Sequence, residues 1–108
     1  MSSKNIKFGE FIEFSVKKKF GIIKLNRFHR GNAITIEMAK NLKKTLEYCQ
    51  KTEKIRGIIL TGTGNSFTTG MDTNEIDGNN PATVKEYEKT AASIQNLLFY
   101  GKPVSKEA

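Results

Sequence analysis

The amino-acid sequence predicts an α/β fold with about three to four strands and two main helices. Two neighbouring runs, residues 11–17 and 20–25, are rich in β-branched and aromatic residues. Two later segments repeat their apolar residues every three or four positions, which is the helical period, and a short apolar run separates them. With 108 residues the chain holds one domain at most, and we place it at residues 11–108, after a polar and flexible N-terminus at residues 1–10.

The first two strands are expected to form a hairpin. Three apolar residues of the first run alternate with other residues and therefore lie on one face of a strand: Ile12, Phe14 and Val16. Three consecutive lysines, Lys17 to Lys19, separate the two runs, and such a run of charge suits a solvated turn.

The first helix is expected from Thr35, a suitable N-cap, to about Thr52. Its apolar residues lie three or four positions apart and so share one face: Ile36, Ala39, Leu42, Leu46 and Cys49. On that face, Cys49 is expected to pack in the core and not to act as a reactive thiol.

A third strand is expected at residues 55–61, where the run is so apolar that we expect a sheet covered on both sides. Pro81 suits the start of the second helix, which runs to about Phe99 before Gly101 and Pro103 end it. The apolar face of this helix comprises Val84, Tyr87, Ala91, Ile94 and Leu98.

The last residues do not follow the expected pattern. Val104 suits the first residue of another buried strand, but polar and charged residues follow it to the end. Three strands and two helices leave a sheet edge and a helix face uncovered. A partner chain, a second copy or further sequence would cover them, so we expect the purified chain to self-associate.

Composition narrows the possible sites and partners. The net charge of +7, from 18 basic and 11 acidic residues, favours an anionic partner without identifying it. Cys49 is the only cysteine and His29 the only histidine, so we expect neither an internal disulfide nor a metal site. No apolar run is long enough to span a bilayer and no secretory signal is visible, so a cytoplasmic protein without a membrane partner is expected.

The most informative pattern lies at residues 56–72, where a buried strand runs into a glycine-rich loop that closes on Gly70, Met71 and Asp72. Such a loop can direct backbone N–H groups at the carbonyl oxygen of a ligand, and donors of this kind stabilise an oxyanion. The alternative is that the glycines only make a tight turn. A second motif, Leu25–Ala33, precedes the first helix.

Together these motifs resemble those of the enoyl-CoA hydratase/isomerase family, the crotonase superfamily. The family has a strand ending in Leu-Asn-Arg-Pro, three variable residues and Asn-Ala, and Leu25–Ala33 matches this pattern with Phe28 in place of the proline. Leu60–Asp72 matches the family's Leu-Thr-Gly strand end, its Phe and its Gly-x-Asp. Lys102–Val104 matches a later Lys-Pro-Val, so three motifs occur in the family's order.

The resemblance implies the N-terminal portion of the crotonase-type β-β-α spiral, a fold that usually assembles as trimers or paired trimers. Family members bind acyl-CoA as a substrate, in fatty acid metabolism and elsewhere, and no separate cofactor is implied. They hold the thioester oxygen between two backbone N–H groups, which stabilise an enolate during hydration, isomerisation or related chemistry.

Residue by residue, the resemblance makes the backbone N–H of Met71 the first oxyanion donor. The implied contacts of the CoA adenosine end are His29, Arg30, Gly31 and Ala33. Those of the pantetheine and acyl segment are Gly70, Met71, Asp72, Thr73 and Asn74. Cations suit phosphate at the adenosine end, but Arg27 and Arg30 could equally be solvated loop residues. Asp72 could equally cap a helix.

In the family, the second oxyanion donor and the catalytic glutamates lie downstream of Lys-Pro-Val. We therefore expect a partial crotonase-like domain, truncated before the second half of the family fold and inactive by itself. It would be active only when complemented, for example as one subunit of a split enzyme. A non-catalytic binding or assembly module is the alternative.

A third possible function is a small basic protein that contacts nucleic acid. That function requires aromatic and basic residues interleaved on one face. We expect the aromatic residues to lie mostly in the core, among them Phe14, Phe20, Tyr87 and Phe99. The sequence therefore predicts no nucleic-acid partner.

Overall fold

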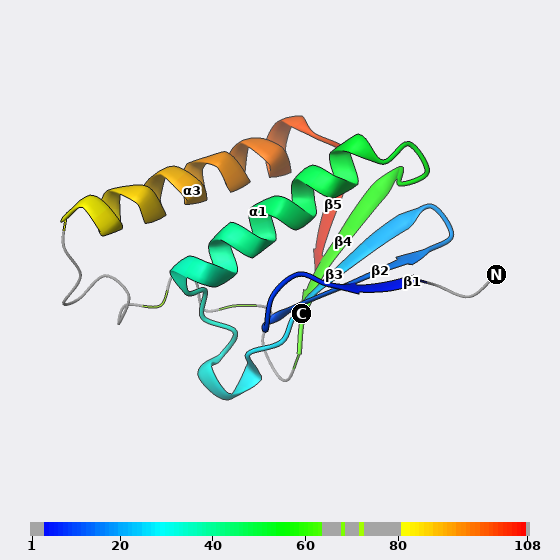
Figure 1. Cartoon of the computed structure of the whole chain (residues 1–108). Coiled ribbons are helices and arrows are strands. Elements are labelled where there is room, and N and C mark those ends of the chain that lie inside the picture. The colour runs from blue at the N-terminus through cyan, green and yellow to red at the C-terminus, as the bar shows by residue number, and fades with distance from the viewer. Residues whose placement is uncertain (1–3, 64–67, 69–71, 73–80, 108) are drawn as a thin grey trace.

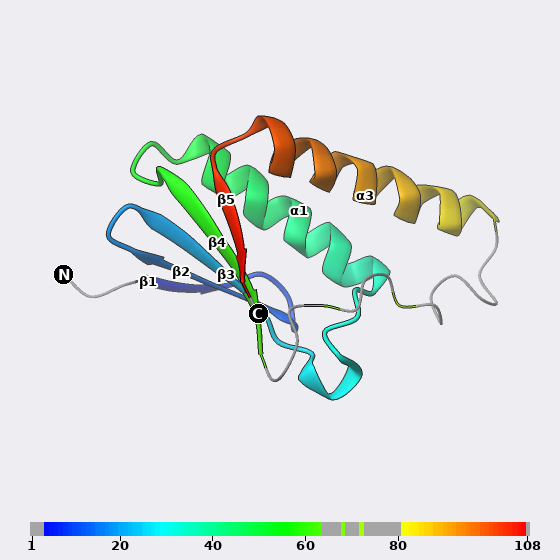
Figure 2. The same cartoon turned by 180° about the vertical axis from the view of Figure 1, so that it is seen from behind.

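A computed structural model of the chain describes residues 4–63, 68, 72 and 81–107. Within these residues, five strands form one mixed sheet in the order β1-β2-β3-β4-β5, and two helices lie side by side on one face of it (Figures 1 and 2). The strands are β1 (Lys4–Lys7), β2 (Ile12–Lys17), β3 (Phe20–Leu25), β4 (Gly57–Gly62) and β5 (Val104–Glu107). The helices are α1 (Ile36–Lys51), α3 (Pro81–Tyr100) and the short 3-10 turn η1 (Phe28–Arg30). The α/β class is confirmed, with five strands where about three to four were expected.

The hairpin is confirmed. Strands β2 and β3 pair antiparallel, with Phe14 opposite Ile23 and Lys17 opposite Phe20, so Lys18 and Lys19 form a two-residue turn. The outer edge of β2 pairs with β1, also antiparallel. Within the N-terminal segment expected to be flexible, the structure thus has a strand at Lys4–Lys7, because the backbone groups of this polar run pair with a strand edge that would otherwise be open.

The second half of the sheet is parallel. Strand β3 crosses through α1 to reach β4, and β5 lies parallel to β4 with Val104 opposite Ile58. The expectation that the charged residues after Val104 would not continue a strand is wrong. They are tolerated in β5 because this strand lies at the edge of the sheet, where charge is common and side chains meet solvent.

Both main helices begin where the sequence predicts. Thr35 caps α1, its hydroxyl accepting a hydrogen bond from the Met38 N–H at 3.1 Å. Pro81 is the first residue of α3, which ends one residue beyond the expected Phe99. The predicted inward face of α1 is buried from Ala39 to Cys49, whereas Ile36 is only partly buried.

The core lies between the helices and one face of the sheet, and six strand residues of that face are buried: Ile12, Phe14, Ile23, Leu25, Ile58 and Leu60. The described helices cover only this face, so the expectation of a sheet covered on both sides is wrong for the described part of the chain (Figure 1). On the opposite face, Ile22 and Ile59 are partly exposed.

Two of the four aromatic residues expected in the core lie there, Phe14 and Tyr87. The other two do not: Phe20 is 47% exposed and Phe99 is 76% exposed. Phe20 belongs to the uncovered face of the sheet, and Phe99 lies near the end of α3. Among the helices that the structure describes, none combines the length and apolar character needed to cross a bilayer.

Candidate functional site

The two sequence motifs meet at the carboxyl end of the parallel strands. Leu25, the last residue of β3, lies opposite Gly62, the last residue of β4, so the loops that follow the two strands start side by side. The first residue after β4, Thr63, donates its N–H to the Leu25 carbonyl at 2.9 Å. In open α/β sheets, ligand sites lie outside the carboxyl ends of the strands, so this end of the sheet is where a site is expected.

The partly buried side chain of Arg27 connects the two loops. Its Nη1 donates to the Asp72 carboxylate at 2.7 Å and to the Ala33 carbonyl at 2.9 Å. Its guanidinium also lies 5.6 Å from the centre of the Phe11 ring. Arg27 is therefore not a solvated loop residue, since its charge is partly buried and paired with a carboxylate 45 positions away.

Asn32 is the second residue that holds the loops together. It is fully buried with a left-handed backbone (φ 56°), a conformation that Asn tolerates better than most residues. Its Oδ1 accepts from the Arg27 N–H and its Nδ2 donates to the Thr63 carbonyl, both at 2.8 Å. The Asn32 carbonyl accepts from the Thr68 hydroxyl at 2.6 Å. The Asn-Ala motif could have identified Asn32 from the sequence, but Asn32 was not among the predicted site residues.

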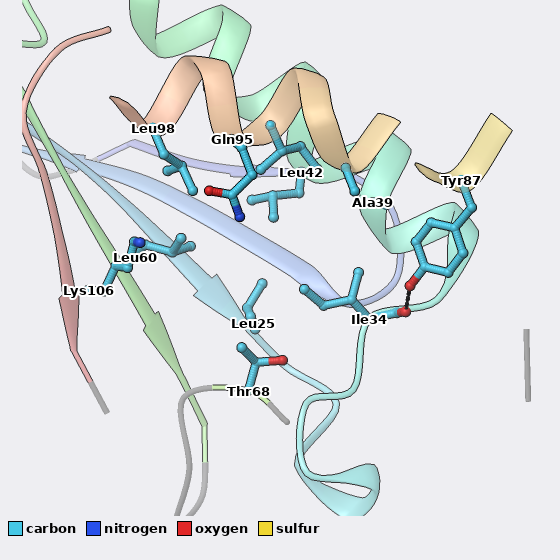
Figure 3. A pocket seen from close by; sticks show the side chains of 12 residues that line it. Leu25, Ile34, Ala39, Leu42, Leu60, Thr68, Tyr87, Gln95, Leu98 and Lys106 are labelled. Carbon is cyan, nitrogen blue, oxygen red and sulfur yellow. Dashed lines mark hydrogen bonds between the residues drawn. The ribbon is translucent and has the colours of Figure 1, made fainter. Parts of the chain in front are cut away.

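The carbonyl of Ile34 connects the same loops to α3. It accepts the Asp72 N–H at 2.9 Å and the hydroxyl of Tyr87 from α3 (Figure 3). Tyr87 was predicted only as an apolar core residue, because helical spacing does not show where a hydroxyl finds its acceptor. Asp72 thus donates its N–H to the Ile34 carbonyl, and its carboxylate accepts a hydrogen bond from Arg27. Through these two contacts, Asp72 connects the loop that follows β4 to the loop that follows β3. The alternative that Asp72 caps a helix stays a prediction, because residues 73–80 lie outside the described residues.

Other predicted site residues lie at the rim. His29 and Arg30 are exposed on η1, with the His29 ring 5.9 Å from Phe28 and 6.4 Å from Phe11. Gly31 ends η1 in a left-handed conformation (φ 62°), which glycine adopts without strain, and Ala33 is partly buried. Four further predicted positions, Gly70, Met71, Thr73 and Asn74, lie outside the described residues.

An apolar cavity of about 310 Å³ lies beside these loops, between α1, α3 and the sheet (Figure 3). Its lining includes Ile34 and Thr68 from the two loops and Ala91 and Leu98 from α3. Lys106, which pairs with Leu60 on the inner face of the sheet, is the one charged residue of the lining. The cavity is lined mostly by apolar side chains and can hold an apolar group.

The described residues offer no metal site and no activated thiol. No group of three or more potential metal ligands occurs among them. Cys49 is buried in α1, and burial raises the pKa of its thiol to about 11, partly opposed by the Lys102 charge. Its place in the hydrophobic core, fully buried, confirms that Cys49 is a packing residue.

Comparison with known proteins agrees with this geometry. The family model described as enoyl-CoA hydratase/isomerase matches residues 16–104. The 1,2-epoxyphenylacetyl-CoA isomerase of Escherichia coli is 36% identical over 75 residues, which are 68% of this chain and 29% of that protein. An enoyl-CoA hydratase/carnithine racemase from Magnetospirillum magneticum superposes with a TM-score of 0.81 at 25% identity, covering 94% of this chain and 40% of that structure. An enoyl-CoA hydratase of Geobacillus kaustophilus gives a TM-score of 0.87 at 12% identity and shows the shared fold. The chain therefore spans about 40% of the length of these solved relatives.

Proposed function

The chain belongs to the enoyl-CoA hydratase/isomerase family, and from this we propose that it carries an acyl-CoA-binding half-site, with the Met71 N–H as one oxyanion donor. The observation that carries the proposal is the Arg27–Asp72 ion pair. It joins the loop of the first motif to the residue that follows Met71 in the sequence. Preorganised donors stabilise developing charge because they need not reorganise during the reaction, and the anchoring of Asp72, the next residue in the sequence, supports such a role for Met71.

The remaining parts of the substrate fit the same end of the sheet. We assign the CoA adenosine end to the rim formed by His29, Arg30, Gly31 and Ala33, where the exposed Arg30 is available to a phosphate. The pantetheine and thioester would follow Gly70 to Asn74. The acyl chain would enter the apolar cavity between α1 and α3, whose loop side begins at Ile34 and Thr68.

Catalysis on this proposal needs groups beyond this half-site. A second oxyanion donor and a general acid–base pair would come from outside these 108 residues, through further sequence or a complementing chain. General acid–base groups typically contribute about 10²–10⁴-fold, so the 108 residues by themselves would bind acyl-CoA with almost no turnover. We place the protein in the cytoplasm and expect it to self-associate when the complementing part is absent.

Calorimetric titration of the purified chain with acetoacetyl-CoA tests this function, with the oligomeric state measured on the same sample. Met71→Pro removes the N–H and should weaken binding by about two- to tenfold, as expected for one lost hydrogen bond to the neutral thioester carbonyl. Met71→Ala keeps the N–H and should bind like the unchanged protein. Free CoA, which lacks the thioester, should bind equally to both variants.

Two outcomes would contradict the proposal. Equal loss of acetoacetyl-CoA binding in both Met71 variants would exclude the backbone donor. A folded chain that binds neither ligand would exclude the half-site and leave the non-catalytic assembly module as the better account.

A further inference from the structure

Most of the net positive charge lies at the end of the molecule opposite the candidate site. Strands β3, β4 and β5 begin together there, with Arg56 donating its N–H to the Lys19 carbonyl at 2.7 Å and Ile58 donating to the Pro103 carbonyl at 2.9 Å. Three connections therefore meet at this end (Figure 2). We define the basic end as the residues of these connections: 17–20, 51–56 and 99–102.

Nearly all of the net charge lies in the basic end. It holds seven of the 18 basic residues and one of the 11 acidic residues, which is a formal charge of +6 out of the chain's +7. Six of its cations are exposed: Lys17, Lys18, Lys19, Lys51, Lys54 and Arg56. None of these six forms an ion pair within the described part of the chain, whereas Arg27, Lys40 and Lys43 each do.

Exposed aromatic rings accompany these cations. Phe20, Phe99 and Tyr100 all belong to the basic end, and Tyr100 is 87% exposed. The Phe20 ring covers Gly57 of the neighbouring strand so closely that a Cβ there would lie 3.2 Å from it. One side of this ring is thus in contact with the neighbouring strand, and the side chain remains 47% exposed to solvent.

We propose that the basic end binds single-stranded nucleic acid. Proteins that bind single strands combine cations that follow the phosphates with aromatic rings on which bases stack. The sequence argued against such a partner because the aromatic residues were expected mostly in the core, and the structure exposes two of them, Phe20 and Phe99, within the basic end. Phe20 is held beside Gly57 at the start of the sheet and is 47% exposed, so its ring is available to a stacking base.

Stabilisation of α1 explains only part of this charge. Cations near the C-terminus of a helix interact favourably with its dipole, which accounts for Lys51 and Lys54. The turn between β2 and β3 needs no positive charge, yet both of its residues are lysines and a third, Lys17, precedes it at the end of β2. Arg56 lies beyond the helix, at the start of β4.

Fluorescence anisotropy with a labelled oligouridylate tests the proposal on the full chain. The triple variant Lys19→Gln, Lys54→Gln, Arg56→Gln should lower the slope of log affinity against log salt by about 2, because each phosphate contact on a single strand contributes roughly 0.7. The control Lys44→Gln, Lys85→Gln, Lys89→Gln removes the same charge from exposed positions elsewhere and should leave most of the slope intact. Equal loss in both variants would overturn the proposal, because the binding would then depend on net charge alone.

A second pair of variants tests the stacking. Phe20→Leu should weaken binding by about 5- to 100-fold without changing the salt slope, as for one lost base stack. Phe28→Leu removes a ring that is exposed at the opposite end of the sheet and should change nothing. No binding of oligouridylate, or binding only to phosphatidylserine vesicles, would overturn the assignment, the latter in favour of a membrane surface.

Discussion

The two ends of the sheet differ in whether their charged side chains are buried and paired or exposed. At the carboxyl end, Arg27 and Asp72 are largely withdrawn from solvent and neutralise each other, and their ion pair fixes two loops. At the basic end, six cations are exposed and, among the described residues, have no acidic partner. The difference shows where charge serves the fold and where it is available to a ligand.

Among the described residues, each end also contains one non-glycine residue with a left-handed backbone, and again the two differ. Asn32 at the carboxyl end is buried and uses its side chain to bridge Arg27 and Thr63. Lys18 at the basic end is exposed in a two-residue turn, with φ 57°. The first conformation is supported by hydrogen bonds, whereas no such support is visible for the second.

The largest expected effect is the loss of the buried ion pair. Arg27→Met should lower the free energy of unfolding by about 4 kcal/mol, because it leaves the Asp72 carboxylate buried without its cation. The Lys40–Glu86 pair has the same 2.7 Å separation, but its side chains are 50% and 57% exposed, against 14% and 8% for Arg27 and Asp72. Lys40→Met should therefore leave the stability unchanged within error. Urea unfolding of both variants measures the two losses of stability. Similar losses would contradict the expected difference between the buried and the exposed pair.

The two left-handed residues should respond in opposite directions. Asn32→Gly keeps the backbone free to adopt φ 56° but removes the side-chain bridge, so we expect a loss of about 3 kcal/mol. Lys18→Gly relieves an unsupported left-handed residue and should increase stability by about 1 kcal/mol. Thermal unfolding followed by circular dichroism measures both changes. A neutral Asn32→Gly would mean that the buried amide does not hold the loops.

The elements that follow local patterns were predictable from the sequence. The hairpin depends on alternation from Ile12 to Val16, and α1 depends on the cap at Thr35 and a repeating apolar face. Strands β1 and β5 were not predictable, because their polar residues carry little strand signal and become strands only by pairing with β2 and β4.

The internal organisation of the candidate site was also beyond local patterns. Sequence analysis selected Asp72 but left Arg27 open, since nothing in a single sequence indicates a partner 45 positions away. Asn32 was overlooked because its backbone conformation depends on the loop that surrounds it. The oxyanion role of Met71 stays a prediction that rests on family resemblance.

A smaller effect is expected from Lys102, the one cation of the basic end that the fold uses directly. Its Nζ donates to the carbonyls of Cys49 and Thr52 at the end of α1, both at 2.7 Å, and its N–H donates to the Gln50 side chain at 3.0 Å. Lys102→Met keeps the aliphatic stem but removes the charged donor, so we expect a loss of about 2 kcal/mol. Lys106→Met, a matched change four residues later on β5, should cost much less in the same urea titration. Equal costs would show that Lys102 does not cap α1.

The smallest effect concerns Cys49, whose backbone carbonyl accepts a hydrogen bond from Lys102. Burial raises the pKa of the Cys49 thiol from 9.0 to about 11, so between these values the folded protein holds a proton that the unfolded chain releases. Stability from this group is complete below pH 9 and is lost as the pH rises toward 11. Relative to Cys49→Ala, the unchanged protein should lose on the order of 1 kcal/mol between pH 8 and pH 10, measured by urea unfolding. The difference between the two proteins isolates the contribution of the thiol. The same difference measured in the Arg27→Met background should not change. Parallel pH profiles for the protein and Cys49→Ala would show that the thiol ionises equally in the folded and unfolded states.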